Sequence, residues 1–374
     1  MFDFVDGAAG SEIGSRLNRS ALSEIQLQPR VLVNVENRSL KTSILGREWD
    51  LPFGIAPMGM CNLTWPGADR ILAAEAVRRN IPFCMSCAAS TTMEEVNLWT
   101  QGQSWFQLYV VQAPDAAMLM ADRAATAGID VLVLTVDVPQ VSRRVRDLKN
   151  GFQVPFRLGP KQILDFALHP RWSIETLFHG VPKPANFATE DGSDGFARGA
   201  SRAGADWSFL DRLRQRWKGK LVVKGVLSAA DAVRIRDAGA DAVYVSNHGG
   251  RQLDSAPAAI QALPQIRQAV GDDFPLIFDS GLRTGEDIVK ALALGADFVM
   301  LGRPIMYAIG ADGTRGFASL VDILAEEISV TLAQIGLRRI EEIDCGNIAS
   351  SSSATQETTC FHGVTERERD FRED

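Results

Sequence analysis

Ala238-Gly-Ala-Asp-Ala-Val-Tyr-Val-Ser-Asn247 is the stretch that decides the fold. Its glycine follows an amphipathic segment, as a helix-ending residue does, and the apolar run after Asp241 suits a strand that is buried on both faces. The same order recurs at Ala127-Gly-Ile-Asp130 and Leu294-Gly-Ala-Asp297, each directly before an apolar run. This repeat predicts a chain in which helices alternate with parallel strands.

Runs of this kind occur eight times along the chain. They are Leu51–Pro57, Pro82–Ser86, Trp105–Val110, Asp130–Asp137, Lys220–Gly225, Asp241–Asn247, Pro275–Ser280 and Asp297–Gly302. Two helix starts are visible between them, because Ser228 and Thr284 each stand three residues before an aspartate, as N-cap residues do. Eight strand and helix units predict an α/β protein with the (β/α)₈ TIM barrel fold, in which the chemistry lies at the carboxyl ends of the strands.

The regular spacing of these units is interrupted once. Between the fourth strand and the helix that begins near Asp206 lies a long loop, about residues 150–205, in which Pro and Gly mix with aromatic residues. A loop of this length on the active face is typical of a lid or a docking surface. We expect a single domain over residues 1–345 and a disordered tail over residues 346–374, which are rich in serine and charge.

The composition argues against several classes of protein. The formal net charge is −7 and no run of basic residues occurs, so we expect no binding of nucleic acid. No apolar stretch approaches the roughly 20 residues of a membrane helix. The first residues lack the basic region of a signal peptide, and five scattered cysteines fit a reducing compartment, so we expect a cytoplasmic protein.

Cys84-Met-Ser-Cys87 has the spacing of a metal-binding pair. No second pair exists, and the alternation of side chains along a strand would separate the two thiols. The four histidines are also spread along the chain. We therefore expect no metal site.

Charged residues follow three neighbouring strands at the reactive end of the predicted barrel. His248-Gly-Gly-Arg251 could supply a general base and an anion anchor, or be a buried histidine in a glycine turn. Asp137 could orient the imidazole, or only cap its own turn. Lys224 could stabilise developing negative charge, or extend out of the barrel rim.

The last two strands end in a pattern suited to phosphate. Asp279-Ser-Gly-Leu-Arg283 and Gly302-Arg303 stand where barrels commonly bind this group. The chain has no phosphate-binding loop of the nucleotide-binding types, so a cofactor phosphate would bind the barrel itself. A catalytically silent phosphate-binding barrel is one interpretation of these features.

Taken together, these motifs resemble those of the FMN-dependent 2-hydroxy-acid oxidising family, which includes glycolate oxidase, L-lactate dehydrogenase and (S)-mandelate dehydrogenase. The matching stretches include Trp105-Phe-Gln-Leu-Tyr-Val110, Thr135-Val-Asp137, Lys224-Gly-Val226, Ser246-Asn-His-Gly-Gly-Arg-Gln-Leu-Asp254 and Lys290-Ala-Leu-Ala-Leu-Gly-Ala296. The similarity extends from about residue 2 to residue 345. It implies a barrel that binds FMN and oxidises a 2-hydroxy acid to the 2-oxo acid.

The resemblance also implies roles for single residues. His248 would be the catalytic base and Asp137 its partner, Arg251 and Arg144 would bind the substrate carboxylate, and Tyr109 would bond to the substrate hydroxyl. The residues that would hold or face the FMN are Ala56, Pro57, Met58, Ser86, Gln107, Thr135, Lys224, Ser246, Asp279, Gly281, Arg283, Gly302 and Arg303.

Three positions depart from the family pattern. Phe4 replaces a tyrosine that helps to hold the substrate carboxylate, Ala88 replaces the tryptophan of glycolate oxidases, and Gly59 replaces the alanine of many oxidases. The last two changes remove volume above the flavin, so we expect a bulky or aromatic substrate such as mandelate. They favour a dehydrogenase that passes electrons to a quinone. The alternative is an oxidase that reduces oxygen to hydrogen peroxide.

The long loop carries a further resemblance. Its segments His169-Pro-Arg-Trp172 and Ala185-Asn-Phe187 resemble the insertion of (S)-mandelate dehydrogenase, which serves membrane and quinone contact. This likeness implies peripheral contact of the 150–205 loop with the inner face of the membrane. The resemblance to the family as a whole implies a homotetramer.

Overall fold

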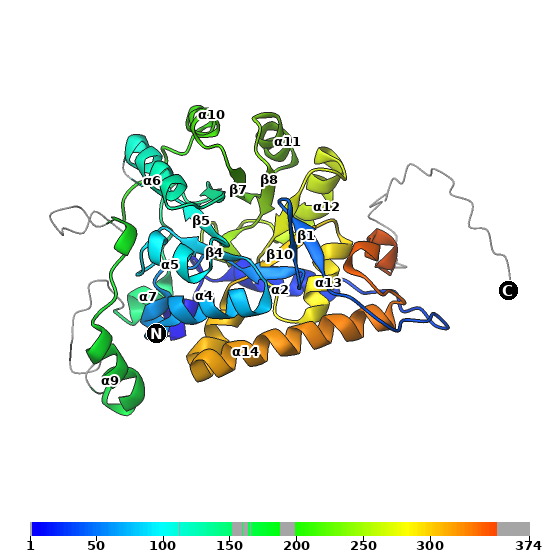
Figure 1. Ribbon diagram of the computed structural model, residues 1–374, viewed down its shortest axis with the longest axis horizontal. Helices are drawn as coiled ribbons and strands as arrows, with labels where there is room; N and C mark the ends of the chain where they lie inside the picture. Colours follow the sequence, from blue (N-terminus) through cyan, green and yellow to red (C-terminus); the bar gives the residue numbers. More distant parts are fainter. Residues whose placement is uncertain are drawn as a thin grey trace.

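The computed structural model describes residues 2–111, 113–151, 159, 164, 166–187 and 199–349. Eight parallel strands form a closed barrel in the order β10-β3-β4-β5-β6-β7-β8-β9 (Figure 1). The strands are β3 (Phe53–Ile55), β4 (Phe83–Ser86), β5 (Ser104–Leu108), β6 (Val131–Thr135), β7 (Lys220–Val226), β8 (Ala242–Val245), β9 (Leu276–Phe278) and β10 (Phe298–Leu301). Each of the eight expected strands is present, so the predicted barrel is confirmed.

Helices follow the barrel strands and surround them (Figure 1). They are α3 (Cys61–Thr64), α4 (Ala68–Arg79), α5 (Met93–Trp99), α6 (Pro114–Thr126), α10 (Trp207–Arg216), α11 (Ala229–Asp237), α12 (Ala259–Val270), α13 (Gly285–Ala293) and α14 (Arg303–Gln334). The predicted caps are confirmed, because the hydroxyls of Ser228 and Thr284 accept hydrogen bonds from the backbone N–H groups of Asp231 and Asp287.

A short hairpin that the sequence analysis missed covers the amino-terminal end of the barrel. Its strands are β1 (Thr42–Ile44) and β2 (Arg47–Trp49). The turn residues Leu45 and Gly46 both have positive φ, 54° and 82°, as a two-residue hairpin requires. Leucine is a rare choice there, which is why no turn signal stood out. Ile44 and Trp49 of the hairpin pack against the side chains inside the barrel.

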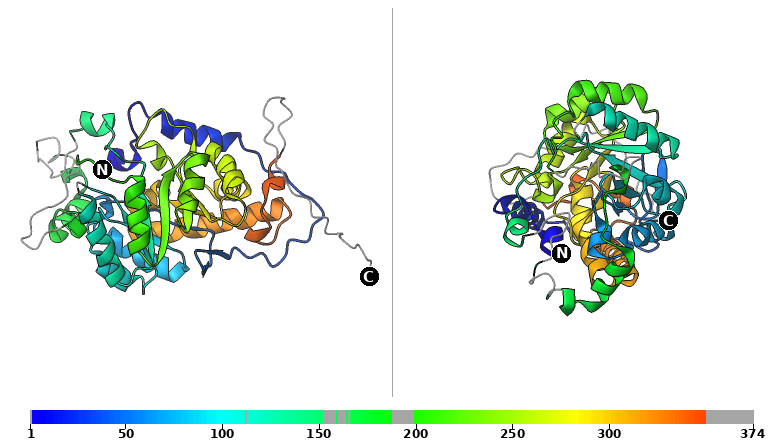
Figure 2. Two further views of the ribbon diagram at one scale, coloured as in Figure 1. Left: turned by 90° about the horizontal axis from the view of Figure 1, so that it is seen from above. Right: turned by 90° about the vertical axis from the view of Figure 1, so that its left-hand side faces the viewer.

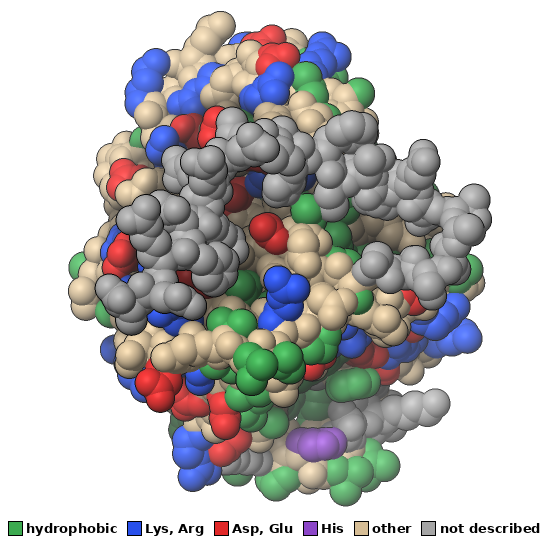
Figure 3. Space-filling view, turned by 90° about the vertical axis from the view of Figure 1, so that its right-hand side faces the viewer, with side chains coloured by type: hydrophobic (Ala, Val, Ile, Leu, Met, Phe, Trp, Pro, Cys, Tyr) green, Lys and Arg blue, Asp and Glu red, His purple; other side chains and the backbone are tan. Residues whose placement is uncertain are grey.

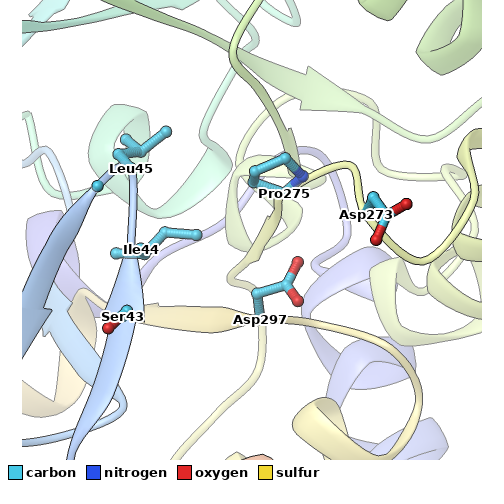
Figure 4. Close-up of a pocket in the computed structure, with 7 residues that line it drawn as sticks. Ser43, Ile44, Leu45, Asp273, Pro275 and Asp297 are labelled. Carbon is cyan, nitrogen blue, oxygen red and sulfur yellow. The ribbon is translucent and has the colours of Figure 1, made fainter.

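A shallow cavity lies between this hairpin and the start of β9 and β10 (Figure 4). Ile44 and Leu45 line one side of it, and Pro275 and Asp297 line the other. The Asp297 carboxylate accepts hydrogen bonds from the Leu276 N–H at 2.7 Å and from Arg267 at 2.6 Å. It therefore stabilises the barrel end, and the cavity lies opposite the strand ends that carry the candidate chemistry.

The remaining described α-helices gather at the carboxyl end of the barrel. They are α1 (Phe2–Asp6), α2 (Ile13–Glu24), α7 (Val145–Lys149) and α9 (Pro170–His179). Figure 2 shows α1, α7 and α9 on the same side of the molecule. Helices α7 and α9 belong to the long interval after β6. The expected tail begins with an ordered turn, Cys345–Asn347, and its residues 350–374 lie outside the described residues.

The two cysteines with metal-like spacing lie in different parts of the core. Cys84 belongs to the apolar cluster inside the barrel, and Cys87 to the cluster between strands and helices. Burial raises the pKa of the Cys87 thiol to about 12. The described residues contain no group of three His, Cys, Asp or Glu side chains placed to hold a metal ion.

No described helix is both long and apolar enough to cross a membrane. Among the described side chains visible in Figure 3, basic and acidic groups are mixed with apolar ones, without a continuous basic area.

A buried carboxyl group in α4 predicts a pH effect on stability. Burial raises the pKa of Asp69 from 3.8 to about 6, although Thr91 and Ser90 donate hydrogen bonds to it. The folded state therefore binds more protons than the unfolded state between about pH 4 and pH 6, so this group lowers stability as the pH rises through that range. Above pH 6 the loss is complete, at most about 3 kcal/mol.

We expect Asp69→Asn to unfold at higher denaturant concentration than the wild type at pH 8, and to show little advantage at pH 4. Denaturant titrations at both pH values measure the difference. An equal shift at both values would mean that Asp69 ionisation does not limit stability.

Candidate active site

The loop after β8 holds His248 in a constrained conformation. His248 has a positive φ of 57°, and Gly249 follows with 66°. The Ser280 hydroxyl, from the end of β9, accepts hydrogen bonds from the Asn247 N–H at 3.2 Å and the Gly249 N–H at 3.0 Å. Ser280 itself has a φ of 91°, which is unusual for a residue with a side chain. Two neighbouring strand ends thus fix the backbone on both sides of the histidine.

The His248 imidazole pairs with Asp137, as the sequence analysis predicted. Its Nδ1 lies 3.1 Å and 3.2 Å from the two carboxylate oxygens, and the side chains are 20% and 12% exposed. Tyr109 Oη lies 3.4 Å from Nε2 on the other side of the ring. The carboxylate favours the tautomer with the proton on Nδ1, so the lone pair is on Nε2. This atom is available to take a proton.

Gly225 makes room for this pair. It has a φ of +103°, and a Cβ atom built on it would lie 2.5 Å from Asp137 Cβ and 2.6 Å from its Cγ. Any side chain at this position would displace Asp137. The requirement for glycine after Lys224 is therefore a packing requirement, which the strand pattern alone did not indicate.

Lys224 points into the barrel mouth and is buried. Its Nζ lies 2.7 Å from Ser246 Oγ and 3.1 Å from Asp279 Oδ2. It also lies 4.6 Å from the centre of the Tyr244 ring. Burial opposes ionisation of Asp279, but Lys224 and three hydroxyl groups hold the pKa of Asp279 below its usual value. The alternative of a lysine that extends out of the rim is wrong.

Polar groups at the ends of β5 and β6 fit a flat heteroaromatic ligand. Among the described residues, Gln107 Nε2 and Thr135 Oγ1 are buried without a hydrogen-bond partner. Gln107 Oε1 accepts a bond from the Ser86 hydroxyl at 2.9 Å, which orients the amide. Buried polar groups in folded proteins normally have partners, so these atoms indicate a ligand with its own donors and acceptors. The nitrogen and oxygen atoms of an isoalloxazine ring fit this requirement.

Two arginines after the last strands fit a phosphate. Arg303 begins α14 and donates to Gly249 O at 3.0 Å, and its Nε has no partner among the described residues. Arg283 stands before α13. Burial lowers the pKa of both guanidinium groups, and the charge of Arg303 lowers that of Arg283 further. An anion between them would relieve this cost, so these two arginines suit the phosphate that the sequence analysis predicted here.

Other predicted cofactor residues occupy the same edge. Ala56, Pro57 and Met58 follow β3 directly, and Met58 lies beside Gly302 after β10. Gly281 is also required for packing, because a Cβ atom there would lie 3.0 Å from Asn18 Cβ and Leu22 Cδ1 of α2. This glycine therefore lets α2 pack closely against the end of β9.

Both predicted carboxylate anchors lie beside the N-terminal segment. Arg251 Nη1 donates to Val5 O at 2.9 Å and to Gly7 O at 2.6 Å, and its Nη2 donates to Phe4 O at 3.0 Å. The Phe4 ring lies 6.0 Å from Arg251 and 5.8 Å from Arg144. The structure thus brings both arginines close to one apolar ring, which stands where the family pattern has a hydroxyl.

Comparison with known proteins identifies the family of this chain. A profile of the FMN-dependent dehydrogenase family matches residues 1–350. The chain belongs to that family. It is 41% identical over 341 residues to (S)-mandelate dehydrogenase of Pseudomonas putida, covering 90% of this chain and 86% of that protein. It is 37% identical over 352 residues to L-lactate dehydrogenase of Pseudomonas syringae pv. syringae (strain B728a), covering 92% of each.

A solved structure of the family has the same fold. The crystal structure of the monotopic membrane protein (S)-mandelate dehydrogenase matches with a TM-score of 0.89 and 39% identity, over 94% of each chain. The present chain is therefore an enzyme for FMN-dependent oxidation of a 2-hydroxy acid. The alternative of a catalytically silent barrel is set aside.

The two small residues of this FMN-dependent dehydrogenase face each other. A Cβ atom built on Gly59 would lie 3.2 Å from Ala88 Cβ and 3.3 Å from Ala88 O. The backbones of the loops after β3 and β4 therefore approach each other closely at these two residues. The side chain of a tryptophan at position 88 would have to extend across or beside Gly59.

Arg202 is a residue near the site that the sequence analysis missed. It is buried, its guanidinium lies 5.1 Å from the centre of the Tyr109 ring, and its backbone N–H donates to Pro139 O at 2.9 Å. Burial raises the pKa of the Tyr109 hydroxyl, while the charges of Arg202 and Arg144 act in the opposite direction. An arginine in a long irregular loop gives no local signal of such a contact.

Proposed function

We propose that this enzyme oxidises a 2-hydroxy acid with a bulky or aromatic side chain, such as mandelate, to the 2-oxo acid. The supporting observation is that the loops after β3 and β4 carry two small residues, Gly59 and Ala88, so that neither loop projects a large side chain at these positions toward the predicted flavin site. The apolar Phe4 ring beside the carboxylate anchors also favours an apolar substrate. The similarity to L-lactate dehydrogenases keeps lactate as the second candidate. Bleaching of the flavin absorbance by each acid under anaerobic conditions tests both.

The proposed chemistry uses the geometry at the barrel mouth. When bound, FMN supplies the two-electron acceptor. His248 Nε2 removes a proton from the substrate, and Asp137 stabilises the imidazolium that forms. The Tyr109 hydroxyl, 3.4 Å from Nε2, orients the substrate hydroxyl toward the base. Lys224 holds a positive charge at the flavin edge of the site, where negative charge develops.

The proposed role of Arg251 predicts a binding defect. Arg251→Met should raise the dissociation constant of the substrate about tenfold and slow flavin reduction, because a charge-assisted pair to the carboxylate is lost. Arg251→Lys should recover only part of the affinity, since an ammonium lacks the planar fork. Stopped-flow flavin reduction at several substrate concentrations measures both constants. Equal turnover of 2-hydroxy acids and their methyl esters would contradict a carboxylate anchor.

We further propose that the electrons pass to a quinone at a membrane surface. Helix α9 and the residues after it expose Ile174 (54%), Leu177 (82%), Phe178 (83%) and Val181 (55%). An exposed apolar helix face of this kind suits insertion into the interface of a bilayer. Cosedimentation of the holoenzyme with anionic lipid vesicles tests the contact, and Leu177→Ser with Phe178→Ser should weaken it.

The rival proposal is an oxidase that reduces oxygen to hydrogen peroxide. Reducing the flavin with substrate under nitrogen and then admitting air separates the two, because an oxidase reoxidises within seconds and releases peroxide. The family resemblance also supports a homotetramer as the assembly, which light scattering of the holoenzyme tests.

A further inference from the structure

Residues 2–15, here called the N-terminal arm, cross the mouth of the barrel. The arm bonds to two strand-end loops, since Ala9 N–H donates to Gly250 O and Gly10 N–H donates to Arg143 O, both at 3.0 Å. It also bonds to α14, where the Tyr307 hydroxyl donates to Asp6 at 2.5 Å. The arm therefore joins the elements that follow β6, β8 and β10.

The arm determines the orientation of Arg251. Three of the five N–H bonds of this guanidinium go to arm carbonyls, those of Phe4, Val5 and Gly7. A guanidinium is planar, so three bonds in one plane leave it little freedom to turn. Any shift of the arm would carry Arg251 with it.

One guanidinium from α7 gathers three carboxylates of the arm. Arg146 makes a bidentate pair with Glu12 at 2.8 Å and 2.7 Å, and bonds to Asp6 at 2.7 Å and Asp3 at 3.1 Å. The hydrogen bonds from Arg146 hold the pKa of Glu12 below its usual value. Two of these carboxylates lie near the two ends of α1 and the third follows it in the chain. Arg146 therefore restrains the whole segment whose carbonyl groups bond to Arg251.

We propose that Arg146 is a positioning residue for substrate binding, which keeps the arm closed over the mouth and thereby holds Arg251 in the orientation that binds a carboxylate. The proposal rests on the proposed role of Arg251 as the anchor. Arg146 itself acts through the arm.

The test compares binding and turnover in the holoenzyme. Arg146→Gln should raise both KM for the 2-hydroxy acid and the dissociation constant of oxalate about tenfold, because the anchor is misplaced, with kcat changed less than about threefold. Oxalate has carboxylates but no oxidisable hydroxyl, and its binding is followed by the flavin absorbance. Arg146→Lys should recover part of the affinity, since a lysine pairs without the fork.

A matched control and a second variant complete the design. Arg123 makes a similar bidentate pair with Glu94, at 2.7 Å and 2.8 Å, between α5 and α6, and its side chain is 38% exposed against 34% for Arg146. Arg123→Gln should leave oxalate affinity unchanged. If Arg146→Gln does not fold, Glu12→Gln replaces it in the test. This variant removes the bidentate pair from the arm side and should also raise KM.

Wild-type KM and oxalate affinity in folded Arg146→Gln would overturn the proposal, even if its melting temperature fell. The outcome is separate from that of the proposed substrate, because oxalate affinity reports on Arg146 even if no 2-hydroxy acid tried reduces the wild-type flavin.

Discussion

His248→Gln is expected to keep FMN bound and to slow flavin reduction by the substrate by about 10³-fold or more, as for loss of a general base. An amide cannot take the proton that Nε2 accepts in the wild type. The fold should survive, because the loop is held by the backbone bonds to Ser280 rather than by the imidazole. Retained FMN is measured by absorbance, and the reduction rate by anaerobic stopped flow.

A substitution of Asp137 tests the same His248–Asp137 pair in a second way. Asp137→Asn should slow reduction as well, because an amide no longer stabilises the imidazolium or selects its tautomer. His169→Gln, at the start of α9, is the control and should reduce at the wild-type rate. Reduction of His248→Gln at a rate close to that of the wild type would remove His248 from the role of base.

Ala88→Trp is expected to reverse the substrate preference of the enzyme. In the wild type, burying a phenyl ring beside Ala88 is worth about 2 kcal/mol at roughly 25 cal/mol per Å², or about thirtyfold in kcat/KM for mandelate over glycolate. The indole would occupy that space and penalise the larger acid by a similar factor. The total change in the ratio is then roughly a thousandfold.

Steady-state rates with mandelate, 2-hydroxyoctanoate, lactate and glycolate, using one artificial electron acceptor, measure this change. Ala88→Val serves as the intermediate case and should reduce the ratio without reversing it. A wild-type enzyme that prefers glycolate would show that another element fills the space beside Gly59 and Ala88, and the bulky-substrate proposal would fall.

Local sequence patterns were sufficient for the barrel. A strand buried on both faces needs a continuous apolar run, and a helix that turns directly into a strand needs glycine at its end, so both leave marks within ten residues of chain. The same holds for the caps at Ser228 and Thr284. The hairpin β1–β2 was missed because its turn places leucine, rather than asparagine or glycine, at a positive φ.

The sequence also predicted that the candidate site residues lie together at the carboxyl end of the barrel, and the structure has them there. Parallel strands bring their carboxyl ends to one rim, so Asp137, Lys224 and His248 were bound to be neighbours once the barrel was recognised. Only the closed barrel decided which of them pair. Asp137 bonds to His248 across 111 positions of sequence, and that contact depends on the absence of a Cβ atom at Gly225.

The tertiary structure alone decided how the arginines are used. The sequence marked Arg251 only as an anion anchor and did not mark Arg146 at all, yet the structure bonds Arg251 to arm carbonyls and Arg146 to three arm carboxylates. A guanidinium lies at the end of a long flexible side chain and can bond to any acceptor within its reach. Its partner is therefore set by which distant segment the fold brings there, and no local periodicity of the chain records that choice.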